Sequence, residues 1–159
     1  MQRKAVVAGI VTSLGLAVGV VGLSRTPATA DHGGDKVMHL KLEVAQQSFT
    51  GDSSSPKLGD QFLINGDVFD DSNTKVGEAV TSCTVASAPP RATEVTCLGD
   101  TVLSKGKITI GGVAPFPPST TPVHFSIIGG TGAFRTARGE FVVTSPSPDT
   151  AEGTFHIVL

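Results

Sequence analysis

The stretch FSIIGGTGAFRTARGEFVV, from Phe125 to Val143, carries four glycines and two arginines between two apolar runs. A glycine-rich loop cradles phosphate when a strand leads into it and a helix follows, because the helix N-terminus adds its dipole. Here the chain returns to a strand pattern within a few residues, no P-loop lysine follows, and GGTGAF lacks the third glycine of the dinucleotide fingerprint. The stretch therefore predicts a tight link between two strands, with Phe134 packed beneath the turn.

The chain on both sides of this link has the same character. Short runs rich in Val, Ile, Thr and Phe are broken by Gly, Pro, Asp, Asn and Ser, and no helical stripe is present. The strand candidates are residues 37–49, 60–70, 75–87, 92–100, 101–112, 122–130, 138–145 and 152–159. Because eight antiparallel strands close around a space for side chains or one small ligand, we expect an all-β, eight-stranded antiparallel β-barrel, with a sandwich as the alternative. The proline-rich run 111–122 is expected to be a loop over one barrel end.

The first thirty residues have the three-part pattern of a secretory signal. Arg3 and Lys4 precede an apolar run at 5–23, and the small residues Ala28 and Ala30 follow it. We expect a cleaved signal peptide over 1–30, a single barrel domain over 31–159 and a secreted protein. The alternative is an uncleaved membrane anchor, since the apolar run approaches the length of a bilayer span.

Charge and aromatic content argue against a nucleic-acid partner. Cleavage after Ala30 would remove three of the twelve basic residues and leave nine against fourteen acidic ones, a net charge of −5. A protein that binds nucleic acid needs cations for the phosphates. The chain also has no Trp or Tyr, so stacking platforms for bases are few. We expect no nucleic-acid partner, and no membrane association once the signal is removed.

The only two cysteines, Cys83 and Cys97, suit a disulfide of an exported protein. If APPR, residues 88–91, forms a hairpin turn, residues whose numbers sum to 180 face each other, and the two cysteines do so. Closing a loop of this length stabilises the fold by about 3 kcal/mol on the loop-entropy estimate. A redox pair would more often have C-x-x-C spacing, and a zinc site would need further ligands nearby.

The motif GGTGAFRTARGEF resembles the signature of the dirigent proteins and of the allene oxide cyclase barrel that they share. The likeness continues upstream in GDQFLINGDVFD, which begins at Gly59, and in the KVG that follows, so it covers residues 59–159 with 37–49 as a first strand. Secreted actinobacterial members with two cysteines in the third and fourth strands look most similar. The resemblance implies an eight-stranded barrel with a largely apolar cavity, assembled as a homotrimer and working without a cofactor.

The resemblance also implies a chemistry. Allene oxide cyclases close an epoxide into a ring and dirigent proteins steer coupling of phenolic intermediates, so in both the cavity folds a reactive apolar substrate while polar groups stabilise developing charge. The acidic group of the first strand corresponds to Glu43, and the motif arginines correspond to Arg135 and Arg138. The candidate catalytic residues are Glu43 and Arg138, and the candidate ligand-binding residues are Phe62, Ile64, Phe134 and Arg135.

This chain departs from the family pattern at several polar positions. By spacing, a cavity asparagine falls on Gly66, a cavity phenylalanine on Ile64, and a turn aspartate on Ala133. Glu43 shares its strand face with Lys41, and that face could equally point to solvent. Arg138 could equally form a structural ion pair.

Metal and hydrolase chemistry find little support in the sequence. The histidines at 39, 124 and 156 stand in separate strand candidates without ligand spacing, so no metal site is expected. GxSxG, the nucleophile elbow, is absent.

The leading hypothesis is a secreted barrel that binds a small hydrophobic metabolite and guides its cyclisation or coupling, as a cofactor-independent isomerase or cyclase. The alternatives are a non-catalytic extracellular carrier and a surface interaction module. The interior discriminates between them: an acid and an arginine that converge in the cavity favour catalysis, a purely apolar lining favours carriage, and a filled interior favours the interaction module.

Overall fold

The computed structural model describes residues 34–118, 120–147 and 149–159, which form eight strands and one short 3₁₀ helix. The predicted signal peptide, residues 1–30, lies outside the described residues. The elements are β1 (Lys36–Phe49), β2 (Gln61–Phe69), β3 (Lys75–Ser87), β4 (Glu94–Leu103), β5 (Gly106–Pro115), β6 (Val123–Gly130), η1 (Gly132–Phe134), β7 (Arg138–Ser147) and β8 (Thr150–Val158).

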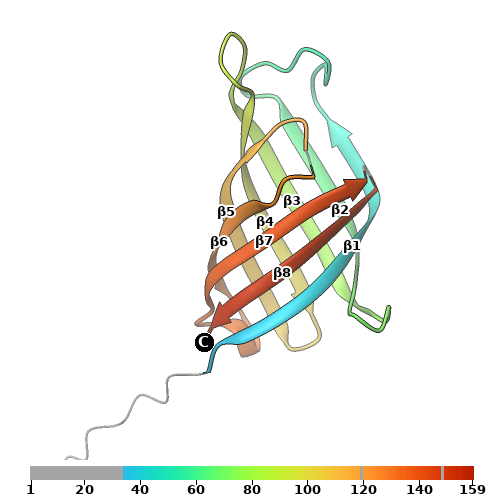
Figure 1. Cartoon of the computed structure of the whole chain (residues 1–159), viewed down its shortest axis with the longest axis vertical. Coiled ribbons are helices and arrows are strands. Elements are labelled where there is room, and N and C mark those ends of the chain that lie inside the picture. The colour runs from blue at the N-terminus through green and yellow to red at the C-terminus, as the bar shows by residue number, and fades with distance from the viewer. Residues whose placement is uncertain (1–33, 119, 148) are drawn as a thin grey trace, which may run out of the picture. The chain divides into compact units, whose positions relative to one another are not determined.

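The strands form a closed barrel in which each pairs antiparallel with its neighbours along the chain, and β1 pairs with β8 (Figure 1). The predicted all-β antiparallel barrel is confirmed, and the sandwich is excluded. Within the described ranges no helix is long and apolar enough to cross a bilayer.

The largest differences from the predicted strand boundaries lie in β4 and β5. The sequence pattern predicts that one strand ends at residue 100 and the next begins at residue 101. In the structure β4 continues to Leu103, and the turn lies at residues 104 and 105. Gly106, at φ +140, opens β5, so the Lys-Gly pair marked the turn within an otherwise continuous run of strand formers. At its other end β5 continues to Pro115, which pairs with Glu94, so the loop over the barrel end is shorter than expected.

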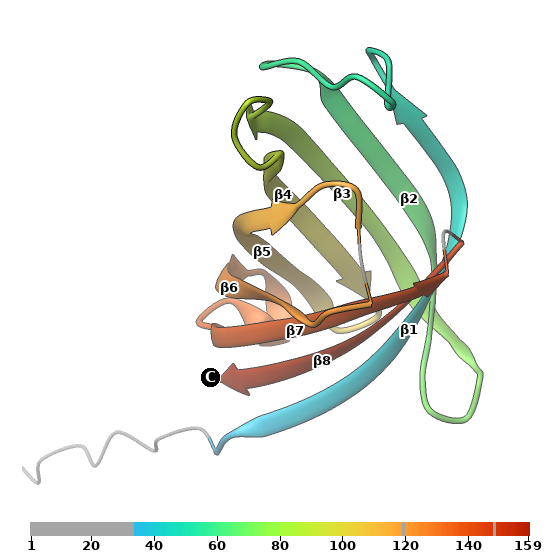
Figure 2. The ribbon, with the colours of Figure 1, turned by 45° about the horizontal axis from the view of Figure 1, so that its top comes forward.

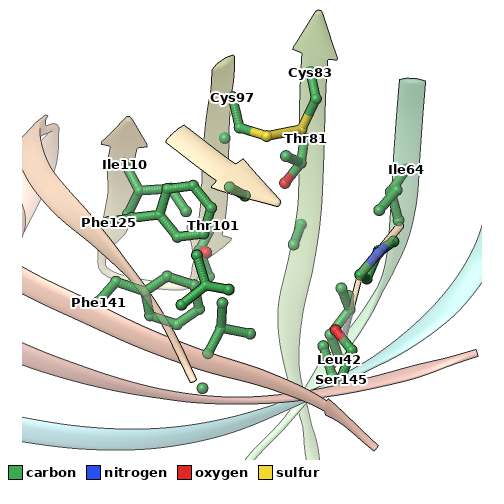
Figure 3. A pocket seen from close by; sticks show the side chains of 18 of the residues that line it. Leu42, Ile64, Thr81, Cys83, Cys97, Thr101, Ile110, Phe125, Phe141 and Ser145 are labelled. Carbon is green, nitrogen blue, oxygen red and sulfur yellow. A yellow bond between two sulfur atoms is a disulfide. The ribbon is translucent and has the colours of Figure 1, made fainter. Parts of the chain in front are cut away.

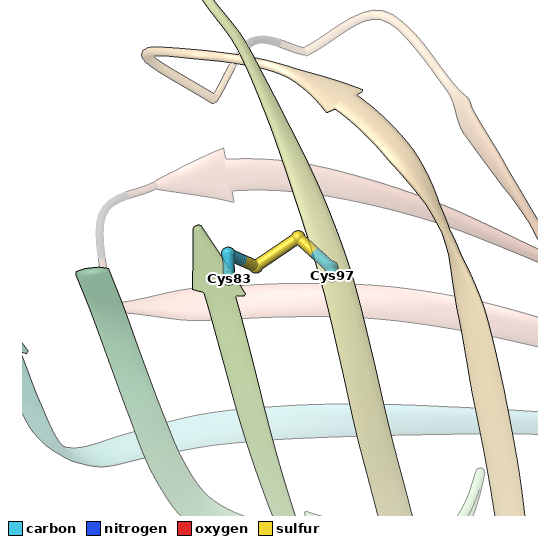
Figure 4. The surroundings of a disulfide bond; sticks show 2 residues. All are labelled: Cys83 and Cys97. Carbon is cyan, nitrogen blue, oxygen red and sulfur yellow. A yellow bond between two sulfur atoms is a disulfide. The ribbon is translucent and has the colours of Figure 1, made fainter. Parts of the chain in front are cut away.

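The predicted cysteine register is confirmed. Cys83 lies directly opposite Cys97 on β3 and β4, and the two form a disulfide (Figure 4). The pairs Ser82↔Leu98, Thr84↔Thr96 and Val85↔Val95 keep the same sum, and the register shifts only at the bulge before Ser87. Both cysteines are buried, so the bridge lies on the inner face of the barrel.

The GGTG stretch forms the link that its glycines predicted. Gly132 has φ +59, in the left-handed region that favours glycine, and opens the turn of 3₁₀ helix that joins β6 to β7. Phe134 is buried beneath this turn. A side chain at Gly130 would collide with the carbonyl oxygen of Lys107 and, at 2.6 Å, with that of Phe134.

The barrel has two unlike ends (Figure 2). The helix end carries η1 and the turns that join β2 to β3 and β4 to β5. Its interior is filled by Ile108, Phe134, Ala137 and Ile157. The loop end carries the connections β1–β2, β3–β4, β5–β6 and β7–β8. Because the core closes the helix end, any space inside the barrel opens toward the loop end.

Candidate functional site

A cavity of about 170 Å³ lies inside the barrel and is lined from Phe62 and Phe116 at the loop end to Val68 and Thr101, near the ends of β2 and β4. Every strand contributes to its wall, and the exposed Pro115 and Pro118 mark where it reaches solvent. The lining is mostly aliphatic and aromatic. An apolar cavity of about 150 Å³ stays dry and accepts benzene, so this one has room for a single ring or a short apolar chain.

One wall of the cavity is aromatic. Phe125, Phe141 and Phe155 lie opposite one another on β6, β7 and β8, and their ring centroids are 6.3 and 4.2 Å apart along the row. Gly153, beside them on β8, makes this stack possible because a Cβ there would overlap the ring of Phe141. The rings stack on one another, so the wall presents a continuous aromatic surface to the cavity.

The wall formed by β3 and β4 is made of small and polar groups. Its inward residues include the disulfide, Gly99, Thr81 and Thr101. Figure 3 shows the hydroxyl oxygens of Thr81, Thr101 and Ser145, the last from β7, among apolar side chains. Among the described residues these three hydroxyls are the polar side-chain groups that face the cavity, and none of them was a predicted site residue.

A sequence signal for two of them existed. Once Cys83 and Cys97 are placed on one inner face, residues two or four positions away along each strand share that face. Thr81 and Thr101 follow from this alternation. Ser145 had no such signal, because β7 contains no cysteine whose disulfide would show which of its residues face inward.

A second group of aromatic side chains lies at the loop end. Phe49 and Phe62 face each other across β1 and β2, and Phe116 comes from the loop after β5. The ring centroids of Phe116 lie 5.5 Å from Phe49 and 6.0 Å from Phe62. Phe62 and Phe116 also line the cavity, so this cluster forms part of its rim.

The predicted site residues divide into two groups. Phe62 and Ile64 line the cavity, as expected for ligand-binding residues. Phe134 does not: it fills the helix end, where the ammonium of Lys36 lies 5.5 Å from the ring centroid. Arg135 caps the 3₁₀ helix through its backbone and is exposed.

The candidate catalytic residues do not meet in the cavity. Glu43 lies on the outer face of β1, where its carboxylate pairs with the Lys41 ammonium at 2.7 Å, because the inward positions of this strand belong to Leu40 and Leu42. Arg138 lies at the helix end, and its Nη1 donates a hydrogen bond to the carbonyl oxygen of Ala137 at 2.7 Å. The described acids and arginines therefore do not converge in the cavity, and catalytic roles for Glu43 and Arg138 have no support from this geometry.

The departure from the family pattern at Gly66 has a steric cause. Gly66 pairs with Val44 beside a bulge in β1, and a Cβ at this position would overlap the carbonyl oxygen of Glu43. No asparagine side chain fits there without a shift of β1. The polar group that the resemblance placed at this position has been lost together with the space for it.

Asp100 borders the cavity, but its carboxylate points to the outer face. It accepts hydrogen bonds from Lys107 Nζ at 2.9 Å and Thr109 Oγ1 at 2.7 Å. Partial burial raises the pKa of Asp100, but the hydrogen bonds from Thr109 and Lys107 outweigh burial and leave the pKa below its ordinary value. Asp100 is thus an ionised surface group and not a proton donor to the cavity. The described side chains form no cluster of three metal-ligating groups.

Residues 38–159 match the family described as the allene oxide cyclase barrel like domain. The chain belongs to this family. The match covers the whole barrel from β1 to β8 and confirms the resemblance carried by the GGTG stretch. No curated protein matches the chain.

Solved structures share the barrel at low sequence identity. Pyocyanin demethylase aligns with a TM-score of 0.66 and 22% identity over 76% of this chain and 98% of its own. AbnU, an exo-specific intermolecular Diels–Alderase, aligns with a TM-score of 0.69 and 17% identity over 78% of this chain and 96% of its own. The Diels–Alderase AbmU from Streptomyces koyangensis gives a TM-score of 0.60 and 14% identity over 77% of this chain and 64% of its own. At these identities the likeness establishes a common fold.

Proposed function

We propose that this allene oxide cyclase-like barrel is exported, binds a small hydrophobic metabolite in its cavity and guides the cyclisation of that metabolite without a cofactor. The observation that carries the proposal is the apolar cavity of about 170 Å³, which opens at the loop end and is closed at the helix end. A protein that acted only as a surface interaction module would have no need of this space.

The lining supports one kind of ring closure over another. No acid and arginine converge in the cavity, so a reaction that needs proton transfer finds no strong acid or base there. A concerted closure needs only that the reacting carbons be held together, and such positioning lowers a barrier by up to about 7–11 kcal/mol. Two barrels of the same fold are named as Diels–Alderases, which is consistent with this mode of action.

A carrier is the second candidate, because the absence of converging charged groups also suits simple storage. The two functions differ in what happens to the ligand. Intramolecular ring closure conserves mass, so a cyclase converts its substrate into an isomer of equal mass and different retention time. A carrier returns the same compound unchanged.

The test incubates purified protein, residues 31–159, with an apolar extract of its source organism and follows bound and free compounds by liquid chromatography and mass spectrometry. Ala79→Leu places a larger side chain on the cavity wall, and Ala86→Leu makes the same change on the exposed face of β3. We expect an equal-mass conversion that Ala79→Leu abolishes and Ala86→Leu preserves. Retention without conversion would favour the carrier, and neither retention nor conversion would refute the proposal.

A further inference from the structure

Thr101 is a largely buried residue whose hydroxyl makes no hydrogen bond to the described part of the chain. Thr101 is 7% exposed, and in the described part of the chain nothing hydrogen-bonds to its hydroxyl or to those of Thr81 and Ser145. No fully enclosed side-chain oxygen or nitrogen of the described residues lacks a partner, so these hydroxyls face the open space of the cavity. A valine would fill the place of Thr101 without the cost of a desolvated hydroxyl.

Small neighbours keep the hydroxyls on β3 and β4 accessible. Thr81 lies opposite Gly99, and Thr101 lies opposite Ala79, so the two threonines are diagonal neighbours on the inner face. A Cβ at Gly99 would stand 2.8 Å from Thr81 Oγ1 and 3.2 Å from Ile110 Cγ1. The glycine thus leaves free the space from which a ligand atom could approach Thr81.

The same cavity offers no charge to balance an anion. Among the described residues that border it, Asp100 is the only charged one, and its carboxylate is turned outward to Lys107 and Thr109. An ionised carboxylate that entered this cavity would lose its hydration without gaining a cation, which is strongly unfavourable. A neutral acceptor, by contrast, would gain hydrogen bonds from hydroxyls that have no partner among the described residues.

We propose that the cavity selects a planar, uncharged molecule that carries a carbonyl or an equivalent acceptor. Its flat part lies against the phenylalanine row of β6, β7 and β8, and its acceptor takes hydrogen bonds from Thr101 and Thr81. This inference deepens the proposed function and rests on it, since it names the class of molecule that the cavity takes. It gives the polar role in the cavity to hydroxyls instead of the candidate catalytic residues Glu43 and Arg138.

The test uses three probes of equal size: acetophenone, α-methylstyrene, in which a methylene group replaces the carbonyl oxygen, and benzoate. Dissociation constants are measured by titration calorimetry or ligand-observed NMR for the parent protein, Thr101→Val and Thr81→Val. Thr96→Val is the matched control, because Thr96 lies on the exposed face of β4. Each variant is compared with the parent for the same ligand, because the hydration free energy of the free ligand is then the same on both sides and cancels.

We expect Thr101→Val and Thr81→Val each to weaken acetophenone binding about three- to tenfold. They should leave α-methylstyrene binding unchanged or tighter, and Thr96→Val should change neither. Benzoate should bind the parent at least about tenfold more weakly than acetophenone. The melting temperature of Thr101→Val should not fall, since the lost hydroxyl has no partner in the protein.

The possible failures are distinguishable. If α-methylstyrene does not bind the parent, the proposed apolar site is refuted and this inference with it. If α-methylstyrene binds but the threonine variants change both ligands equally, only the assignment of the hydroxyls is wrong. Benzoate binding as tight as that of acetophenone would overturn the selection for neutral ligands.

Discussion

Truncation of Phe134 to alanine should be among the most damaging single changes in this barrel. The side chain is 3% exposed and belongs to the cluster with Ile108 and Ile157 that closes the helix end. Replacement of a buried phenylalanine by alanine costs about 3–5 kcal/mol, because the lost transfer energy is joined by the cost of the void. For a domain of this size the melting temperature should fall by about 10–20 °C.

The chain has no Trp or Tyr, so unfolding is best followed by far-ultraviolet circular dichroism in urea with the disulfide intact. Phe116→Ala is the matched control, because Phe116 is only half-buried at the loop end. It should cost less than half as much. If Phe134→Ala lowers the free energy of unfolding by no more than Phe116→Ala does, the packed core at the helix end does not contribute more to stability than the loop end, and our description of it is wrong.

Three further predictions concern other parts of the barrel. Gly132→Val should cost more than about 1 kcal/mol because valine is strained at φ +59, and an unchanged melt would show that the link is a loose loop. Cys97→Ala should lower the free energy of unfolding by about 2–4 kcal/mol without unfolding the barrel at 25 °C, and native protein should show no reactive thiol before reduction. Asp100 has a folded-state pKa below the ordinary 3.8, so its stabilisation is present above that value and is lost as pH falls through the folded pKa. Below about pH 4 the free energy of unfolding of Asp100→Asn should therefore decline less steeply with acidification than that of the parent protein. An equally steep decline in both proteins would contradict the role of the hydrogen bonds of Asp100.

Local patterns predicted the fold well because each constrained the backbone directly. The disulfide register followed from arithmetic, since antiparallel pairing keeps the sum of two facing residue numbers constant. The buried position of Phe134 followed from the glycines around it. The turn before Gly106 was missed because strand formers on both sides hide a two-residue connection.

The candidate site was predicted less well because family positions were carried over against the local pattern. In β1 the apolar Leu40 and Leu42 alternate with Lys41 and Glu43, and this alternation alone would have placed Glu43 outside. The resemblance had suggested an acid in the cavity, whereas the polar groups that face this cavity are the hydroxyls of Thr81, Thr101 and Ser145. Sequence also could not show that Thr101 lacks a partner, because that depends on neighbours from other strands.

The pairing of β1 with β8 also determines when this sheet can be completed. Lys36 faces Ile157, so the ladder that closes the barrel joins the two ends of the domain, and the barrel cannot close until the C-terminal strand is available. Until then the edges of β1 and β7 both offer unpaired backbone groups to other chains. A chain cut before Thr150 would keep these edges permanently, and we expect it to aggregate instead of settling as a smaller barrel.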